Sequence, residues 1–287
     1  MKVLISKNSG FCFGVNRAIE LASCLIQSSK KNIYSLGEII HNKQVVEKLK
    51  SSGLKPIQDI SQITKGHILI RSHGISLSLL EEIKKRKLKI IDATCPFIKK
   101  IQKIVQKLDK EGYLVIIIGE KNHPEIKSLI SFAKEVIVVK NKQEALKVKK
   151  FSKIGIVGQT TIPQELFYEI VNILLKNKQE VRVYNTICNT TIIRQKNTIS
   201  LAKKVNLMLI VGNKNSANTF SLYKLCKKIN KNTYHIEEVN EIKNKWLSCA
   251  KSVGISGGAS TPNWVIKKIA EKCKLPNSKY EIRNPNE

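Results

Sequence analysis

Asp92-Ala93-Thr94-Cys95-Pro96 is the stretch that decides how this chain folds. It follows Leu88-Lys89-Ile90-Ile91, a largely apolar run of strand length. Pro96 suits the first position of a helix, because its ring fixes φ and its missing N–H would have had no partner there. Cys95 is therefore predicted to lie where a strand ends and a helix begins, the edge at which open α/β sheets bind ligands. The positive end of the helix favours the thiolate, the form of cysteine that binds metals or attacks electrophiles.

Two further cysteines have similar surroundings, in Phe11-Cys12-Phe13-Gly14 and in Thr186-Ile187-Cys188-Asn189-Thr190. Cys12, Cys95 and Cys188 are 83 and 93 residues apart, which is about one small α/β unit each. The spacing predicts three α/β domains. We place them at residues 1–94 with Cys12, His41 and His73, at 95–187 with Cys95, His123, Glu125 and Thr160, and at 188–287 with Cys188, Ser216, Asn218, Ser260 and the C-terminal segment.

Short apolar runs separated by helical patterns predict the strands of these units. Polar or glycine-rich motifs follow nearly every run, so we expect the strand ends of all three units to converge on one central site. The runs are residues 2–6, 33–36, 67–71, 88–91, 113–118, 135–139, 153–157, 181–184, 207–211 and 252–256, and residues 279–287 contain one further candidate strand.

The composition describes a globular chain of 287 residues with 42% apolar residues and a formal net charge of +29. So much positive charge is compatible with nucleic-acid binding. However, the chain has 45 lysines and only 6 arginines, and the lysines are spread over almost every expected helix. Nucleic-acid sites usually use arginine forks, so we interpret most of this charge as solvated surface and expect no specific nucleic-acid partner. A basic surface favours acidic protein partners, including small electron carriers.

No apolar run is long enough to span a bilayer, so we expect no membrane partner. Met1-Lys2-Val3-Leu4-Ile5-Ser6 leads directly into the Cys12 motif and leaves no room for a signal peptide. We therefore expect a cytoplasmic protein whose seven cysteines do not form a disulfide framework. Cys24 falls inside a helical pattern and is expected to be a buried structural thiol.

Several polar side chains follow the expected strands. His41 and His73 occupy strand-to-helix junctions, where a single histidine is often only structural. His123 and Glu125 flank Pro124, so Glu125 either stabilises the helix dipole or forms a proton-transfer pair with the histidine. Thr160 starts a helix and is consistent with a simple cap. The loops that contain Ser216, Asn218 and Ser260 are rich in small hydroxyl and amide residues, which suits phosphate binding at helix starts.

Three cysteines and three histidines in such positions allow several chemistries. A zinc site is one, although structural zinc sites usually have closely spaced cysteine pairs, which this chain lacks. A Cys–His nucleophile is another, but it needs only one of the three cysteines. An iron–sulfur cluster is the third: its cysteines are often closely spaced too, but one cysteine from each of three units suits a cubane with one corner left free. A free metal position is typical of catalytic sites.

Taken together and in order, nine motifs are similar to those of the LytB-type 4-hydroxy-3-methylbut-2-enyl diphosphate reductases over essentially the whole chain. They are Gly10-Phe11-Cys12-Phe13-Gly14-Val15, Ile40-His41-Asn42, Arg71-Ser72-His73-Gly74, Asp92-Ala93-Thr94-Cys95-Pro96, Asn122-His123-Pro124-Glu125, Gly158-Gln159-Thr160-Thr161, Asn185-Thr186-Ile187-Cys188, Lys214-Asn215-Ser216 with Asn218, and Gly258-Ala259-Ser260 with Pro262.

The resemblance implies the last step of the methylerythritol phosphate route to isoprenoids, the reductive removal of an allylic hydroxyl to give isopentenyl and dimethylallyl diphosphates. It implies three α/β domains in pseudo-threefold arrangement around one [4Fe-4S] cluster, and an external electron donor, ferredoxin or flavodoxin. By motif, Cys12, Cys95 and Cys188 would be the cluster ligands. His41, His73, His123, Ser216, Asn218 and Ser260 would bind the diphosphate, and His123 would also be a catalytic residue. Glu125 would deliver protons, and Thr160 would orient the hydroxyl.

One position departs from the family pattern. The family commonly has Ser-Ser-Asn where this chain has Ser216-Ala217-Asn218. The loss of one hydroxyl contact is worth about 1 kcal/mol or somewhat more for a charged acceptor. This change is expected to weaken substrate binding without abolishing the function. A zinc-dependent hydrolase of a phosphorylated small molecule is the alternative function.

Overall fold

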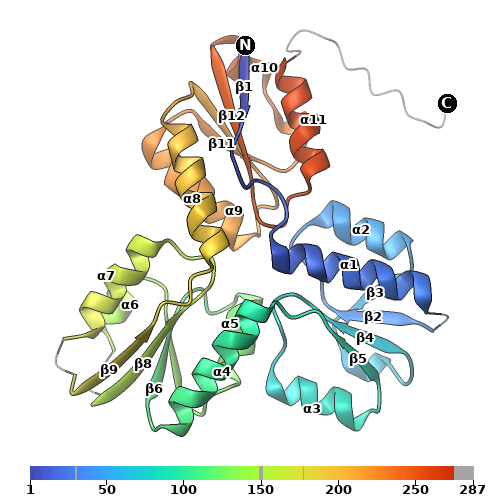
Figure 1. Cartoon of the computed structure of the whole chain (residues 1–287), viewed down its shortest axis with the longest axis vertical. Helices are drawn as coiled ribbons and strands as arrows, with labels where there is room; N and C mark the ends of the chain where they lie inside the picture. Colours follow the sequence, from blue (N-terminus) through green and yellow to red (C-terminus); the bar gives the residue numbers. More distant parts are fainter. Residues whose placement is uncertain (30, 149–150, 177, 275–287) are drawn as a thin grey trace.

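The computed structural model describes residues 1–29, 31–148, 151–176 and 178–274, and it folds into three lobes around a common centre (Figure 1). Each lobe contains one four-stranded sheet in which all strands are parallel. Helices cover the sheets, as parallel strands require, because both faces of a parallel sheet must be shielded from water. The prediction of three similar α/β domains in pseudo-threefold arrangement is confirmed.

The first sheet has the order β3-β2-β4-β5. Its strands are β2 (Ile33–Leu36), β3 (Leu54–Ile57), β4 (His67–Ile70) and β5 (Lys89–Asp92), and its lobe contains α1 (Phe13–Ser28), α2 (Lys43–Ser51), the short 3₁₀ helix η1 (Ile60–Gln62) and α3 (Leu77–Lys85).

The second sheet has the order β7-β6-β8-β9. Its strands are β6 (Leu114–Ile118), β7 (Val136–Val139), β8 (Lys153–Gly158) and β9 (Glu180–Tyr184), accompanied by α4 (Pro96–Lys110), α5 (Pro124–Ile130), α6 (Lys142–Leu146) and α7 (Gln164–Leu174). All five residues of β6 are buried, which explains why this strand is a continuous apolar run rather than an alternating one.

The third sheet has the order β1-β12-β10-β11. It consists of β10 (Leu207–Val211), β11 (Thr233–Ile236), β12 (Ser252–Gly257) and the N-terminal strand β1 (Lys2–Ile5). The accompanying helices are α8 (Asn189–Ala202), α9 (Ala217–Ile229), η2 (Val239–Glu241), α10 (Asn244–Ser248) and α11 (Asn263–Lys274).

Strand β1 lies in a different sheet from the one that the sequence-based division assigned to it. Residues 1–94 were expected to form the first unit, but β1 pairs with β12, in a register that runs from Lys2 opposite Ser252 to Ile5 opposite Ile255. By occupying the outer place beside β12, β1 gives the third sheet the strand arrangement of the other two. The boundaries near Cys95 and Cys188 stay a prediction.

Two edge strands were not expected from the sequence. Strand β3 contains Pro56, whose ring removes a backbone donor and disguises the strand signal, and such prolines occur on edge strands. Strand β11 is only four residues long and also lies at an edge. Edge strands gain less from burial than central ones, so their sequences carry a weaker apolar pattern.

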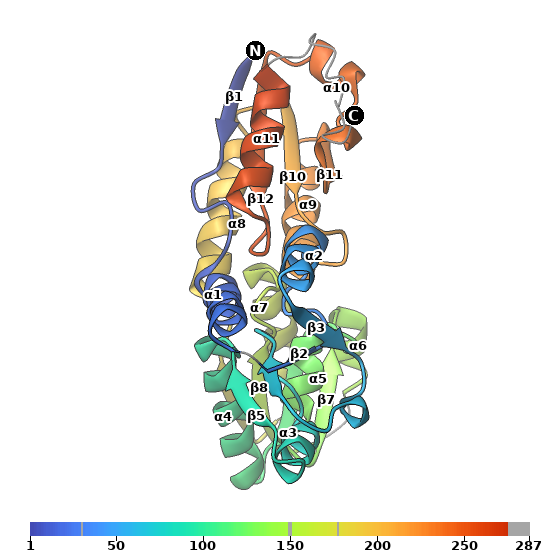
Figure 2. The same cartoon turned by 90° about the vertical axis from the view of Figure 1, so that its right-hand side faces the viewer.

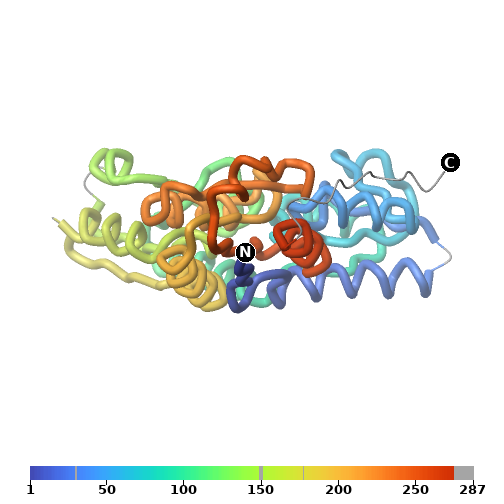
Figure 3. The backbone as a smooth tube through the Cα atoms, turned by 90° about the horizontal axis from the view of Figure 1, so that it is seen from above, coloured from blue at the N-terminus to red at the C-terminus, as the bar shows by residue number. Residues whose placement is uncertain are grey.

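Three helices follow the three cysteines and lie on one face of the molecule. The views in Figures 2 and 3 show a flat body, with α8, α1 and α4 along one side in Figure 2. The expectation for Cys24 on α1 is wrong: its side chain is exposed, because the buried stripe of this helix consists of Val15, Ala18 and Ala22. In the part of the chain that the structure describes, no helix is both long and apolar enough to cross a bilayer. Residues 279–287, with the candidate strand, lie outside the described residues.

Candidate active site

The three sheets present their polar motifs at equivalent places. In each sheet, the chain order reverses between the two central strands, and loops at such a switch point form the usual binding crevice of an α/β sheet. The first central strand of each sheet leads to His41, to His123 and Glu125, or to Ser216 and Asn218, the second central strand to His73, Thr160 or Ser260, and the outer strand beside it to Cys95, Cys188 or Cys12.

One cavity brings all of these residues together. Its lining includes Cys12, Cys95, Cys188, His41, His73, His123, Glu125, Thr160, Ser216, Asn218 and Ser260. Every residue for which the sequence suggested a role in the site therefore lies at one place, and the expected convergence of strand ends is confirmed. Their individual roles stay predictions.

A backbone hydrogen bond fixes each of the three cysteines at the start of a helix. Cys12, Cys95 and Cys188 are the N-cap residues of α1, α4 and α8, as the position of Pro96 predicted for Cys95. The cysteine N–H groups donate to the carbonyl of Ala259 (3.0 Å), Ser72 (2.9 Å) and Thr160 (3.1 Å), respectively. In each case the acceptor lies in the loop after the second central strand of the same sheet, so the three contacts repeat one another around the centre.

The cysteine side chains are free thiols and half-buried. Burial raises the pKa of Cys95, although the N–H groups of Phe97 and Ile98 oppose this shift, and Cys12 and Cys188 lie close enough to influence it electrostatically. Gly14 allows the close approach of α1 to Cys95, since a Cβ at this position would lie 2.7 Å from the Cys95 sulfur.

The geometry distinguishes a single ion from a larger group at these cysteines. Sulfurs that share one zinc ion must all lie within about 2.3 Å of it. Among the described residues, the set of three or more ligand atoms close enough for one ion is provided by the histidines, not by the cysteines. Cysteines that enter one cavity from three junctions therefore fit a multi-atom inorganic group better than a single ion.

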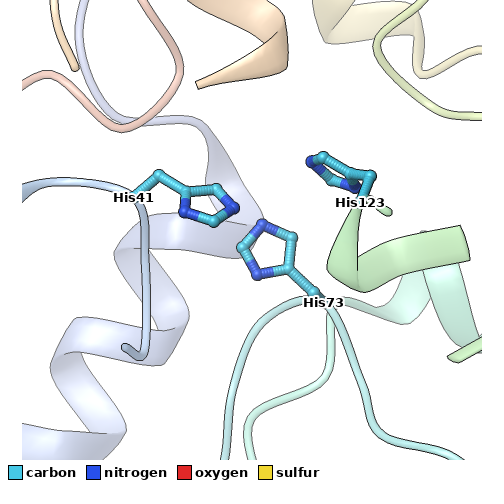
Figure 4. Close-up of side chains that lie close together, drawn as sticks. All are labelled: His41, His73 and His123. Carbon is cyan, nitrogen blue, oxygen red and sulfur yellow. The ribbon is translucent and has the colours of Figure 1, made fainter. Parts of the chain in front are cut away.

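The three histidines point toward one another from three different loops (Figure 4). The His41 ring centroid lies 4.7 Å from that of His73 and 5.7 Å from that of His123, and the third distance is 5.5 Å. Burial lowers the pKa of all three rings, to about 3 for His123 and well below the usual value for His73. The positive charge of Arg71 acts in the same direction. The rings are therefore neutral at pH 7.

Several buried polar atoms of the site have no protein partner. They are Nε2 of His41, Nδ1 of His73 and both side-chain polar atoms of Asn218. His123 accepts the Glu125 N–H at Nδ1 (3.2 Å), so its neutral ring carries the proton on Nε2, which remains available as a donor. Buried polar groups normally find partners, and a cluster of unpaired ones indicates a place where a polar ligand binds.

Two serines lie beside these histidines and Asn218, and together the six residues form the histidine wall of the cavity. Ser216 caps α9 by accepting the N–H of Thr219 (3.4 Å), and Ser260 donates to the carbonyl of His41 (2.9 Å). Ala217, the residue that departs from the family pattern, also lines the cavity. The N-terminus of α9, with Ser216 and Asn218 in its first turn, adds the positive end of a helix dipole to the same wall.

Glu125 is fully buried and bound at both oxygens to one residue. Its Oε1 accepts the N–H of Thr160 at 2.8 Å, and its Oε2 accepts the Thr160 hydroxyl at 2.7 Å. Burial raises the pKa of Glu125 to about 7, although both hydrogen bonds from Thr160 oppose this shift. A carboxyl group with this pKa exists in both protonation states near neutral pH, as an acid catalyst requires.

This raised pKa gives a testable pH dependence of stability. The folded protein holds the Glu125 proton more tightly than the unfolded chain, whose carboxyl has a pKa near 4.5. The stabilising contribution is complete below pH 4.5 and is lost as the pH rises through about 7. We expect wild type to lose on the order of 3 kcal/mol relative to Glu125→Gln across this range, measured by denaturant unfolding. A stability difference that does not change with pH would contradict the raised pKa.

Two arginines near the site were missed by the sequence analysis. Arg194 lines the cavity and is only 2% exposed, and Arg71 lies close enough to the histidines to influence their pKa values. Arg194 stands in a helix and forms no recognisable pattern, and Arg71 belongs to the motif Arg71-Ser72-His73-Gly74, in which only the histidine was given a role. The available signal was the rarity of arginine in a lysine-rich chain.

The fold and the site together define a class of protein: a three-lobed α/β enzyme whose strand ends enclose one cavity with three free cysteines and the histidine wall. The comparison with protein families gives the particular family. Residues 3–274 match the family model described as LytB protein. The chain belongs to the LytB family, and the resemblance drawn from the nine motifs is confirmed.

Relatives with curated names agree over nearly the whole chain. A 4-hydroxy-3-methylbut-2-enyl diphosphate reductase of Geotalea uraniireducens is 42% identical over 96% of this chain and 98% of its own length. The protein of the same name from Syntrophotalea carbinolica is 44% identical, over 95% of this chain and 98% of its own.

Two solved structures are also similar. One is described as the structure of (E)-4-hydroxy-3-methyl-but-2-enyl diphosphate reductase, the terminal enzyme of the non-mevalonate pathway. It has 42% identity and a TM-score of 0.70, and it covers 96% of this chain and 99% of its own. The other, the E-1-hydroxy-2-methyl-but-2-enyl-4-diphosphate reductase from Plasmodium falciparum, has 30% identity and a TM-score of 0.91, over 97% of this chain and 89% of its own.

Proposed function

We propose that this chain reduces (E)-4-hydroxy-3-methylbut-2-enyl diphosphate to isopentenyl and dimethylallyl diphosphates. The observation that carries the proposal is the single cavity in which three free cysteines, unpaired anion-binding groups and a buried carboxyl with a pKa of about 7 lie together. The curated names of full-length relatives support the same reaction.

Cys12, Cys95 and Cys188 are assigned as the ligands of a [4Fe-4S] cluster, one per chain. Thiolates are the usual ligands of iron–sulfur clusters, and these three line one cavity. When bound, the cluster would pass electrons to the substrate and would supply Lewis-acid chemistry toward the allylic hydroxyl. The chain itself holds the three sulfurs through the N-cap positions of α1, α4 and α8.

The histidine wall is assigned to the diphosphate. His41, His73, His123, Ser216, Asn218 and Ser260 line the cavity with hydrogen-bonding side chains, of which Ser260 donates to the His41 carbonyl. A bound diphosphate would satisfy buried groups that have no partner in the protein, and its negative charge would favour protonation of the histidines. The start of α9 adds backbone N–H groups to the same side. This wall anchors the charged end of the substrate and leaves the hydroxyl end toward the cysteines.

Glu125 and Thr160 are assigned to proton transfer, with His123 beside them. Removal of the hydroxyl as water takes two electrons and two protons, one proton for the leaving oxygen and one for the hydrocarbon product. Glu125 is the buried acid that can provide a proton at neutral pH. The Thr160 hydroxyl lies 2.7 Å from the Glu125 Oε2 atom and can relay the proton or orient the substrate hydroxyl.

An acidic one-electron carrier, ferredoxin or flavodoxin, is assigned as the electron donor. The chain has no nicotinamide or flavin fingerprint, and its net charge of +29 attracts an acidic protein.

The first test is an analysis of iron, acid-labile sulfide and zinc in protein purified without oxygen. We expect about four iron and four sulfide per chain, and turnover of the allylic diphosphate with a chemical one-electron reductant. Iron and sulfide that remain absent after reconstitution would contradict the proposal.

A zinc-dependent hydrolase of a phosphorylated small molecule is the second candidate. The observation in its favour is the histidine trio, whose ligand atoms lie within 4.8 Å of one another and could hold one ion. This candidate expects about one zinc per chain, a colourless protein and activity without any reductant. The same metal analysis therefore separates the two functions.

A further inference from the structure

The chain has six arginines and 45 lysines, and two of the arginines in the described residues hold loops of the site. Of the five in the described residues, Arg86 and Arg182 pair with carboxylates at the surface. Arg17 and Arg194 instead donate to backbone carbonyls of the loops around the cavity. Each of these two guanidinium groups spans two carbonyls through separate terminal nitrogens, an arrangement that its planar fork fixes more rigidly than an ammonium does.

Arg194 connects the helix after Cys188 to the loop of Cys12. It lies on α8, is 2% exposed, and donates through one terminal nitrogen to the Gly10 carbonyl (2.8 Å) and through the other to the Gly257 carbonyl (2.7 Å). Gly257 ends β12 and begins the loop that carries Ser260. The Arg194 side chain therefore holds the loop of Gly10 and the loop of Gly257 against α8, although the two glycines are 247 residues apart in the sequence.

Arg17 makes the corresponding connection at the next junction. It lies on α1, the helix that begins after Cys12, and reaches the loop of Cys95. One of its terminal nitrogens donates to the Thr94 carbonyl (3.4 Å) and the other to the Asp92 carbonyl (3.3 Å). Arg17 and Arg194 thus come from the second turns of two cysteine-capped helices, and each contacts the loop of the preceding or following cysteine.

We infer that Arg17 and Arg194 are positioning residues that fix Cys12, Cys95 and Cys188 relative to one another before any inorganic group is bound. This inference rests on the assignment of these cysteines as cluster ligands under the proposed function. Each cysteine caps a different helix and stands at a different junction between lobes, so backbone contacts within one sheet cannot fix all three separations. The two arginines span two of the three junctions.

The charge of Arg194 adds an electrostatic role. Its guanidinium is buried close enough to interact electrostatically with Cys12 and Cys188, and its Nε has no protein partner. Positive charge beside the sulfurs of a cluster favours the reduced, more negative state. Arg194→Gln is therefore expected to lower the reduction potential of the bound cluster, whereas Arg194→Lys keeps the charge and loses the fork.

Hydrogen exchange of the metal-free protein tests the positional role without any cluster. We expect Arg194→Lys to make amides at residues 10–14 and 257–261 exchange about tenfold faster, and Arg17→Lys to do the same at residues 92–96. Exchange in the buried strand β6 serves as the internal reference for global stability. Arg86→Lys, which changes only an ion pair on α3, is the matched control and should alter none of these segments.

The reconstituted proteins provide the second measurement. We expect both lysine variants to lose iron to a chelator about tenfold faster than wild type and Arg86→Lys, and Arg194→Gln to show a lower midpoint potential than Arg194→Lys. Unchanged exchange at the cysteine loops in both lysine variants would overturn the inference. If wild type binds no cluster while the exchange changes occur, the proposed function fails and the positional role of the arginines stands.

Discussion

Replacement of Cys12, Cys95 or Cys188 by serine, one at a time, is expected to reduce bound iron from about four per chain to near zero after aerobic handling and to abolish turnover. Iron in sulfide clusters is held by thiolates, and a hydroxyl is a much poorer ligand for it. The three positions are related by the pseudo-threefold arrangement, so the three losses should be similar. Iron and sulfide analysis and the visible absorption spectrum measure the effect.

Cys24→Ser is the matched control for these variants. Cys24 lies on α1, the helix that begins after Cys12, but its side chain is exposed to solvent. We expect the Cys24→Ser protein to keep its iron, its colour and its turnover. Equal iron content in all four variants would refute the ligand assignment.

Local sequence signals were sufficient to predict most of the fold. Pro96 after Cys95 marked a strand-to-helix junction, and the structure has β5 ending at Asp92 and α4 beginning at Pro96. The cysteine spacing gave the number of α/β units, because each unit uses about the same length of chain to build one four-stranded parallel sheet.

The partner of β1 could not be predicted from local signals. A strand of four residues at the N-terminus carries no mark of the sheet it joins, and proximity in sequence favoured the first sheet. In the structure β1 pairs with β12, near the other end of the described chain. This pairing gives the third sheet four strands in the same arrangement as the first and second sheets. Cys12 consequently follows an outer strand of the third sheet, as Cys95 and Cys188 follow the outer strands of the first and second.

The candidate site was predicted mainly from polar motifs that follow strand ends, and Arg194, in the interior of a helix, was missed. His41, His73 and Ser260 belong to short polar loops, which are visible in the sequence. Arg194 reaches the cavity from the second turn of α8, and its importance depends on carbonyls that are distant in sequence. The raised pKa of Glu125 could not be predicted from the sequence either, because it depends on the complete burial of the carboxyl and on its hydrogen bonds with Thr160.

Replacement of Glu125 by glutamine is expected to lower turnover about 100-fold or more while leaving the bound cluster intact. The amide can still accept the Thr160 N–H and donate to its hydroxyl, so the local geometry is retained. It cannot release a proton to the leaving oxygen. Turnover with excess chemical reductant, together with iron content, separates this loss from loss of the cluster.

The pH profile ties the effect to the acid form of Glu125. Its pKa of about 7 means that the protonated fraction, and with it kcat/KM, should fall about tenfold per pH unit above neutrality. Glu125→Gln should lack this decline, and Glu125→Asp, which keeps an acid, should retain more turnover than the amide. Glu120→Gln, an exposed change in the preceding loop, is the control and should behave as wild type. Near-normal turnover in Glu125→Gln would remove Glu125 from the proton path, because the amide cannot release a proton.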